Sequence, residues 1–417
     1  MPIPGAPRCR RSVALEASWL EGTSPAFRLM IATSWLAPEA WRVHQENAIL
    51  TATAGGMDWP EYLRMLDRHG TLGFGWAALR RVPQIGVPDT VAQVLKRRSD
   101  DCRRQAILYC VILADLLKHF NLAAIPAMPL KGQILSFDLY NDVGLRYSRD
   151  LDVEVRKEDL CRAQACLESL EWQLDSTFFP MSPRQWESFL EYEHSMTFIH
   201  SGSGCVLELH WRNHWETPEA ANSRWARSVP VDWQGRSIQT MSPGDLVLYL
   251  CGHGCGHLWF RAKWVGDLAR AHAVGLLDWN AAWNEARSSD QQNVLLVGLR
   301  LLDLLYRLPL PNLPDNTGKD LQPYLIEIPV RALRDPKVPA YRTDLANFLY
   351  KIQLSRYEHA LRPRKTWRES LGRFFHSPHD FRTLSLPDSL FWAYKPLRPL
   401  LWLWRWSQQL WRRARKI

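Results

Sequence analysis

The sequence has few cysteines, and none of them are paired in a Cys-x-x-Cys pattern. Eight occur in 417 residues, and several occupy apolar positions of expected helices. Cysteines at such positions are typically reduced thiols that pack as small apolar side chains. We therefore expect free thiols in the core rather than a disulfide framework.

The sequence also lacks an uninterrupted apolar run of membrane-spanning length, and it lacks the pattern of a signal peptide. A basic stretch at residues 8–11 is followed by the acid-containing residues 15–18. These absences predict a cytoplasmic protein. There is no internal repeat or low-complexity tract, and the length and 46% hydrophobic content suffice for two or three domains.

Positive charge is concentrated near the C-terminal end. The chain has a formal net charge of +9, but residues 361–417 alone hold 13 Lys or Arg and 3 Asp or Glu. The body is therefore nearly neutral, so we expect no nucleic acid as a partner. Residues 396–417 form a candidate helix rich in tryptophan and arginine, which either lies in an anionic membrane interface on the inner surface or docks on the body.

Breaks in the apolar patterns divide the chain into four regions. Residues 1–120 form an N-terminal helical region whose first 30 or so residues are expected to be loosely ordered. Residues 121–240 alternate strands with helices, and residues 241–310 form a second helical domain. A C-terminal extension, residues 311–417, ends in the basic tail helix.

Two aspartates mark the strand expected within residues 146–155. Alternate residues of a strand share one face, so Asp150 and Asp152 project together. Apolar residues between and after them supply the buried face, which predicts that the aspartate face is open. Adjacent carboxylates repel each other unless a cation lies between them, and oxygen ligands suit Mg²⁺ or Mn²⁺.

A phosphate cradle is expected just before this strand. Residues 124–130 have the composition of a short strand, and residues 133–140 have a helical face. Lys131 and Gly132 lie between them. Backbone amides at a helix N-terminus point at an anion, and Lys131 adds a full positive charge beside them.

A hairpin is expected further along the chain. Residues 194–200 and 205–211 alternate apolar and polar residues around a Ser-Gly-Ser-Gly turn. Glu208 and His210 share the face opposite the apolar one. Glu208 is a candidate third carboxylate, whereas His194 and His210 are expected to be structural histidines.

These motifs together resemble the nucleotidyltransferases of the DNA polymerase beta type, and more closely the bacterial family of uncharacterised "nucleotidyltransferase family" proteins. The resemblance covers about residues 55 to 310, and it implies an α+β fold with a mixed β-sheet flanked by helices. The matching segments are Leu130-Lys131-Gly132, residues 144–152, residues 207–211, His253-Gly254-x-x-His257-x-Trp259 and Trp264-x-x-Asp267-Leu268-Ala269.

The chain departs from the wider superfamily at the glycine turn. A Gly-Ser or Gly-Gly pair usually lies close before the aspartates, whereas Gly132 is followed by Gln133, and Asp150 lies well beyond. Ser148 is the candidate to replace the missing hydroxyl. Asp138 and Asp142, which lie between, are expected on a helix face and in a turn.

The resemblance implies a metal-dependent mechanism. Asp150 and Asp152 would hold one or two Mg²⁺ or Mn²⁺ ions, with Glu208 as third ligand and candidate general base. A hydroxyl of the acceptor attacks the alpha phosphorus of a nucleoside triphosphate such as ATP, and pyrophosphate leaves. The residues expected to contact the nucleotide are Lys131, Gly132, Arg146 and Ser148.

The sequence leaves two possible roles for each of several residues. Arg146 either binds a phosphate or pairs with Glu154 on the surface. Asp267 is either a cleft residue or a partner of Lys263 or Arg270.

His253 and His257 lie one helical turn apart on an expected helix. A pair of cysteines lies about 200° around the same helix, so the four side chains cannot form one zinc site. The histidines either bind a metal with an acid from elsewhere or line the cleft.

The sequence thus predicts an enzyme that transfers a nucleoside monophosphate to a hydroxyl-bearing acceptor. A sugar, another small molecule, a peptide and a protein all remain open as acceptors. The first alternative is a non-catalytic binding or regulatory protein with the same fold, favoured by the long spacing from Gly132 to Asp150. The second is a phosphohydrolase, which would release phosphate instead of pyrophosphate.

Overall fold

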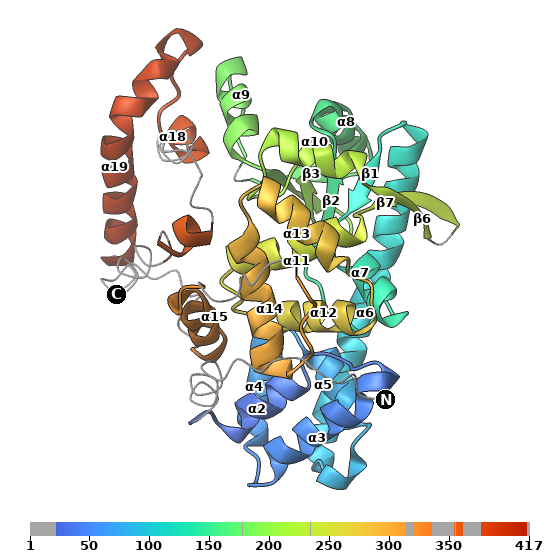
Figure 1. The fold of residues 1–417 in the computed structure, drawn as a ribbon. Coiled ribbons are helices and arrows are strands. Elements are labelled where there is room, and N and C mark those ends of the chain that lie inside the picture. The colour runs from blue at the N-terminus through green and yellow to red at the C-terminus, as the bar shows by residue number, and fades with distance from the viewer. Residues whose placement is uncertain are drawn as a thin grey trace.

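The fold is taken from a computed structural model, which describes residues 22–176, 178–233, 235–313, 321–335, 354, 356–361 and 377–414 (Figure 1). It is a mixed α/β architecture with a five-stranded sheet flanked by helices and further helices toward both ends of the chain. This arrangement confirms the expected fold class. In Figure 1 helices α11 to α14 lie between the N-terminal helices and the sheet.

The N-terminal region is helical, as predicted. Its elements are α2 (Pro25–Ala32), η1 (Glu39–Trp41), α3 (Arg42–Thr53), α4 (Trp59–His69), α5 (Leu72–Leu79), η2 (Pro83–Ile85) and α6 (Asp89–Leu122). The expectation of loose order up to about residue 30 is wrong from Ser24 onward, because Ser24 caps α2 and most of this helix is buried. Residues 1–21 lie outside the described part of the chain.

Helix α6 connects the two main cores. Leu95 packs with the N-terminal helices, whereas the segment from Tyr109 to Phe120 packs against the sheet. By length and composition alone α6 is apolar enough to cross a membrane, and 44% of its most apolar window is buried inside the molecule. Its packing on both cores gives it a structural role within the fold.

The five-stranded sheet has the order β1-β2-β5-β4-β3. The strands are β1 (Ala127–Pro129), β2 (Leu151–Val155), β3 (Trp172–Leu174), β4 (Ser195–His200) and β5 (Val206–His210). Only β2 and β5 pair in parallel, and β4 and β5 form the predicted hairpin. The apolar face of the sheet packs on α6, α8 (Leu160–Ser169) and α9 (Pro183–Tyr192).

The remaining elements of this region flank the sheet. They are α7 (Gln133–Tyr140), η3 (Lys157–Asp159), α10 (Pro218–Ala226), and the two-stranded sheet of β6 (Val229–Trp233) and β7 (Arg236–Thr240). Helix α7 has the bounds expected from the sequence. Gly132 precedes it with a φ of 70°, and Asn141 ends it in the left-handed region.

The second helical region consists of α11 (Pro243–Gly256), α12 (Ala262–Ala273), α13 (Trp279–Ser288) and α14 (Gln292–Tyr306). Ser242 and Asp278 cap α11 and α13, as the sequence indicated. These helices share one hydrophobic core with α2 to α5. The two helical regions are therefore joined by packing, although they are separated in sequence by the sheet.

The C-terminal extension adds α15 (Tyr324–Arg334), α18 (Pro378–Thr383), η5 (Asp388–Ala393) and α19 (Tyr394–Ala414). Helix α15 packs on α14, whereas α18, η5 and α19 form a small separate core with Phe179. The predicted tail helix is thus a helix, and it stands at the left edge of the molecule in Figure 1.

Candidate functional site

Two carboxylates and a histidine meet on the central strands. The parallel pairing of β2 with β5 places Asp152 beside Glu208. His210 follows Glu208 on the same face, and its Nε2 lies 3.3 Å from Asp152 Oδ1 and 3.4 Å from Glu208 Oε2. Ligand atoms of the three residues lie within 4.8 Å of one another, which makes them the only candidate metal-binding group among the described residues.

The lysine-glycine turn lies against this cluster. Lys131 Nζ is 3.2 Å from Asp152 Oδ1. Gly132 immediately precedes α7, and a Cβ on it would lie 3.7 Å from Ser148 Oγ. The hydroxyl of Ser148 in turn donates a hydrogen bond to Asp150. Its Oγ lies 3.1 Å from the backbone carbonyl oxygen of Asp150 and 3.2 Å from Asp150 Oδ1. The turn, the serine and the aspartates are therefore neighbours, as the sequence predicted.

The two carboxylate oxygens of Asp152 differ in whether a neighbouring side chain pairs with them. Its Oδ1 faces both Lys131 and His210, whereas its buried Oδ2 has no hydrogen-bond partner among the described residues. Burial opposes ionisation, but the charges of Lys131 and His210 hold the pKa of Asp152 well below its usual range. The carboxylate is therefore ionised with lone pairs to spare, which is the state that a hard cation needs.

His210 and Lys131, which neighbour Asp152, carry positive charge that balances the carboxylates. Burial lowers the pKa of His210, but hydrogen bonds that its ring donates to Asp152 and Glu208 raise it to about 9. Burial likewise opposes the charge of Lys131, and the surrounding carboxylates leave its pKa above the ordinary value. Burial and the charge of Asp152 raise the pKa of Asp150. Two cations thus compensate the carboxylate cluster.

The expectation of an open aspartate face is wrong. Asp152 is 4% exposed and Glu154 is fully buried, so β2 is covered on both faces. Glu154 accepts hydrogen bonds from Arg224 and from the indole of Trp225, both on α10. The cover comes from elements later in the chain, which the strand pattern does not reveal. Glu208 remains the accessible member, with its side chain 37% exposed.

Arg146 pairs with Asp267 and not with Glu154, the side chain that was the alternative to a phosphate. Its Nε lies 3.0 and 2.9 Å from the two carboxylate oxygens of Asp267 on α12, and both side chains are buried. Pairing with Glu154 is therefore wrong, as is the pairing of Asp267 with Lys263 or Arg270, which bind backbone carbonyls instead. Arg146 Nη1 is buried without a partner among the described residues.

His253 and His257 contact each other edge to face, and both rings lie against Trp264. The two imidazole centroids are 4.7 Å apart, and each lies 5.1 Å from the Trp264 ring. Burial, reinforced by the charge of Lys131, lowers the pKa of both histidines, to about 4 for His257. They are thus neutral groups that feel the charge of Lys131, and their expected place along the cleft stays a prediction.

Several buried polar atoms in the elements around the site have no hydrogen-bond partner in the part of the chain that the structure describes. Besides Asp152 Oδ2 and Arg146 Nη1, they include Gln133 Nε2, Tyr140 Oη and His253 Nε2 among the described residues. These atoms come from β2, α7, α11 and the segment before β2. Buried polar groups are normally satisfied, so each of these atoms is a candidate contact for a polar ligand or for ordered water.

His210 is the site residue that the sequence interpretation did not assign. The strand pattern already put it on the face of Glu208, but a structural histidine was the default. The parallel pairing of β2 with β5 decides the matter, because it brings His210 to Asp152. Asp150, expected to be an equal ligand, does not belong to the 4.8 Å group and lies just before β2.

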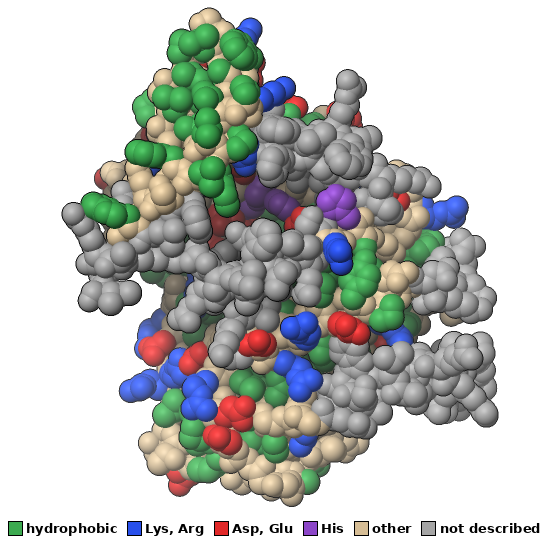
Figure 2. Space-filling view, turned by 90° about the vertical axis from the view of Figure 1, so that its left-hand side faces the viewer, with side chains coloured by type: hydrophobic (Ala, Val, Ile, Leu, Met, Phe, Trp, Pro, Cys, Tyr) green, Lys and Arg blue, Asp and Glu red, His purple; other side chains and the backbone are tan. Residues whose placement is uncertain are grey.

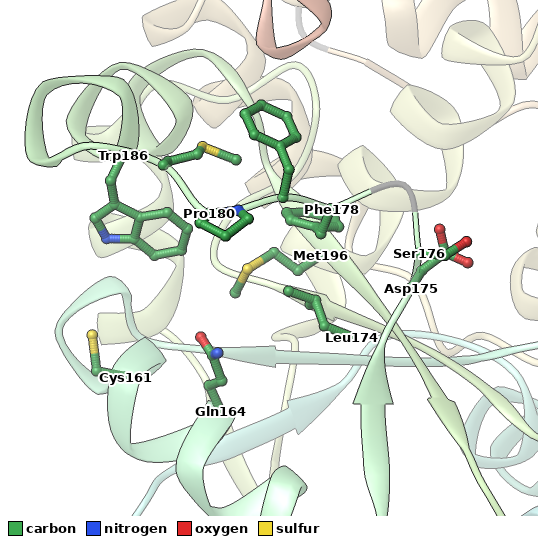
Figure 3. A pocket seen from close by; sticks show the side chains of 11 residues that line it. Cys161, Gln164, Leu174, Asp175, Ser176, Phe178, Pro180, Trp186 and Met196 are labelled. Atoms are coloured by element: carbon green, nitrogen blue, oxygen red, sulfur yellow. The ribbon is translucent and has the colours of Figure 1, made fainter. Parts of the chain in front are cut away.

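A separate apolar pocket of about 500 Å³ lies between α8, β3, β4 and α9 (Figure 3). Leu174, Phe178, Trp186 and Met196 line it. Met196 is paired with Leu209 and shares the apolar face of the sheet, so this pocket opens on the side opposite Glu208. It contributes nothing to the carboxylate cluster.

Comparison with known proteins identifies one family. A family described as uncharacterised nucleotidyltransferase matches residues 55–307, which is more than half of the chain. The matched segment contains every residue of the cluster described above. Neither the curated proteins nor the solved structures contain a match to this chain.

Proposed function

The chain belongs to the family of uncharacterised nucleotidyltransferases, and from this premise we propose that it transfers a nucleoside monophosphate to an acceptor hydroxyl with the help of a divalent cation. The observation that carries the proposal is the register of β2 and β5, which places Glu208 beside an ionised Asp152 with an unpartnered oxygen. A nucleoside triphosphate such as ATP is the donor, and pyrophosphate is the second product.

The donor set fits Mg²⁺ or Mn²⁺. Asp152 and Glu208 would hold the ion, and Asp150 lies beside them as a further oxygen donor. When bound there, the cation would supply charge neutralisation for the triphosphate and lower the pKa of the acceptor hydroxyl. His210 is protonated at neutral pH and would keep Asp152 and Glu208 oriented.

The chain's own residues account for the remaining requirements. Lys131, next to Asp152, would neutralise the phosphates that leave as pyrophosphate. The amides that begin α7 after Gly132 point away from the helix and suit an anion, and Ser148 adds a hydroxyl beside them. Glu208, the accessible carboxylate, would take the proton of the attacking hydroxyl.

The second candidate is a non-catalytic protein that keeps the fold. The observation in its favour is the ion pair between Lys131 and Asp152, which occupies one carboxylate oxygen with a side chain. In that case nucleotide binding would survive without transfer. Both candidate functions include nucleotide binding, and only the first includes transfer of the nucleoside monophosphate.

Label transfer from alpha-labelled nucleoside triphosphates distinguishes these possibilities. The wild-type protein, incubated with Mg²⁺ and cell extract, is expected to label an acceptor and release pyrophosphate. Asp152→Asn and Glu208→Gln should abolish transfer, whereas Glu158→Gln, an exposed acid just after β2, should not. Equal labelling by all four proteins would overturn the assignment, and binding without transfer in the wild type would establish the second candidate.

A further inference from the structure

Helix α19 is held in one rotational position by a buried acid. Asp380 on α18 is 1% exposed and binds both Arg398, at 2.6 Å, and Arg405. The two arginines are seven residues apart, which is two turns on the same helix face. Tyr394 and Leu401 pack into the small core on this side. One face of α19 is therefore fixed against the protein.

The roughly opposite face carries large apolar side chains that remain in solvent. Leu400, Leu403 and Trp404 are 63%, 49% and 58% exposed, and at 100° per residue they fall within an arc of about 100°. Trp411, two turns beyond Trp404, is also exposed. Figure 2, which views the molecule from the side where α19 stands, shows hydrophobic side chains gathered over this helix. We call Leu400, Leu403 and Trp404 the apolar face of α19.

The positive charge of the segment that contains α19 indicates which kind of partner this face binds. Residues 389–417 contain seven Lys or Arg and no Asp or Glu, and five of the seven remain besides Arg398 and Arg405, which bind Asp380. Association of two copies through the same faces would bring these cations against each other, which disfavours a dimer. An anionic bilayer offers the opposite charge to the cations and an apolar boundary to the leucines, and tryptophan prefers that boundary.

We propose that α19 docks the protein on an anionic lipid surface. The apolar face enters the headgroup region, while basic residues of the same segment other than Arg398 and Arg405 stay at the level of the lipid phosphates. The clamp of Arg398 and Arg405 on Asp380 orients the helix so that this face points away from the body. The proposal does not depend on transferase activity.

Cosedimentation of the full chain with vesicles tests the proposal. Binding is expected to vesicles that contain phosphatidylglycerol, to be much weaker with phosphatidylcholine alone, and to decline as salt is raised. The variant Leu400→Ser/Leu403→Ser/Trp404→Ser should bind at least about tenfold more weakly. All three side chains are exposed, so the fold should survive, and circular dichroism verifies this.

A matched variant removes exposed apolar side chains from another helix. Ile107, Leu108 and Val111 on α6 are 46%, 47% and 62% exposed, and Ile107→Ser/Leu108→Ser/Val111→Ser should bind vesicles as the wild type does. The proposal is overturned if the wild type ignores anionic vesicles at low salt, or if both triple variants lose binding equally. It is also overturned if light scattering shows a wild-type dimer that the α19 variant dissociates, because a second copy then covers the face.

Discussion

Removing Arg146 should destabilise the protein far more than removing Arg146 and Asp267 together. Both side chains are at most 2% exposed and are joined at 2.9 to 3.0 Å. Arg146→Met leaves the Asp267 carboxylate buried without its partner, which costs about 3 to 5 kcal/mol. The double variant Arg146→Met/Asp267→Leu buries no unpaired charge, so about 2 kcal/mol or more of that loss should return.

Urea unfolding followed by tryptophan fluorescence measures these differences as shifts of the midpoint. The exposed pair of Lys96 and Asp100, at 3.0 Å on α6, provides the control cycle, and its coupling should be too small to resolve. Additive losses in the Arg146 and Asp267 cycle would refute the reasoning, since they would mean that the two charges do not depend on each other. The link between the sheet and α12 would then lie elsewhere.

Three further predictions follow from single sites. Because the pKa of His210 is raised from 6.5 to about 9, its protonated form stabilises the fold by at most about 3 kcal/mol below pH 6.5. This contribution is lost as the pH rises from 6.5 to about 9. Urea midpoints measured in metal-free buffer should therefore fall over that range, and they should fall less in His210→Gln. Gly266→Ala should destabilise the protein by about 1 to 3 kcal/mol, because its Cβ would lie 2.3 Å from the carbonyl oxygen of Ser34, whereas Gly256→Ala meets no atom within 4 Å and should be tolerated in a thermal melt. Among the described cysteines, exposed Cys161 should react with a thiol reagent first, while Cys205, whose pKa burial raises to about 12, should react only on unfolding; early labelling of Cys205 would contradict its placement.

Local chemistry explains which elements could be predicted from the sequence. Helix α7 follows from a glycine with positive φ before it, and the capped starts of α11 and α13 follow from Ser242 and Asp278. The hairpin follows from alternation around its glycine-rich turn, and the same alternation put Glu208 on the correct face. Each of these features is decided within a few residues of the chain.

Contacts between distant segments explain what the sequence did not reveal. Arg146 and Asp267 are 121 residues apart, and nothing in either segment names the other as its partner. The face of β2 that looks solvent-exposed in the strand pattern is buried, because α10 covers Glu154 while Lys131 and His210 contact Asp152. His210 enters the site through the parallel pairing of β2 with β5, a choice of partner strand that alternation cannot indicate.

The division into four regions stays a prediction. The hydrophobic core shared by α2 to α5 with α11 to α14 indicates that the N-terminal region and residues 241–310 depend on each other for folding. The sheet has its own core, to which α6 contributes its second half. Boundaries drawn from sequence breaks therefore need not coincide with units that fold alone.

Direct binding of Mn²⁺, followed by electron paramagnetic resonance, tests the central claim that Asp152 and Glu208 hold a divalent cation. Wild-type protein and Glu158→Gln should bind Mn²⁺ equally, and added Mg²⁺ should displace it. Asp152→Asn and Glu208→Gln should each weaken binding by at least the roughly tenfold that loss of even an outer-shell partner costs. Mn²⁺ binding that is the same in all four proteins would contradict the account.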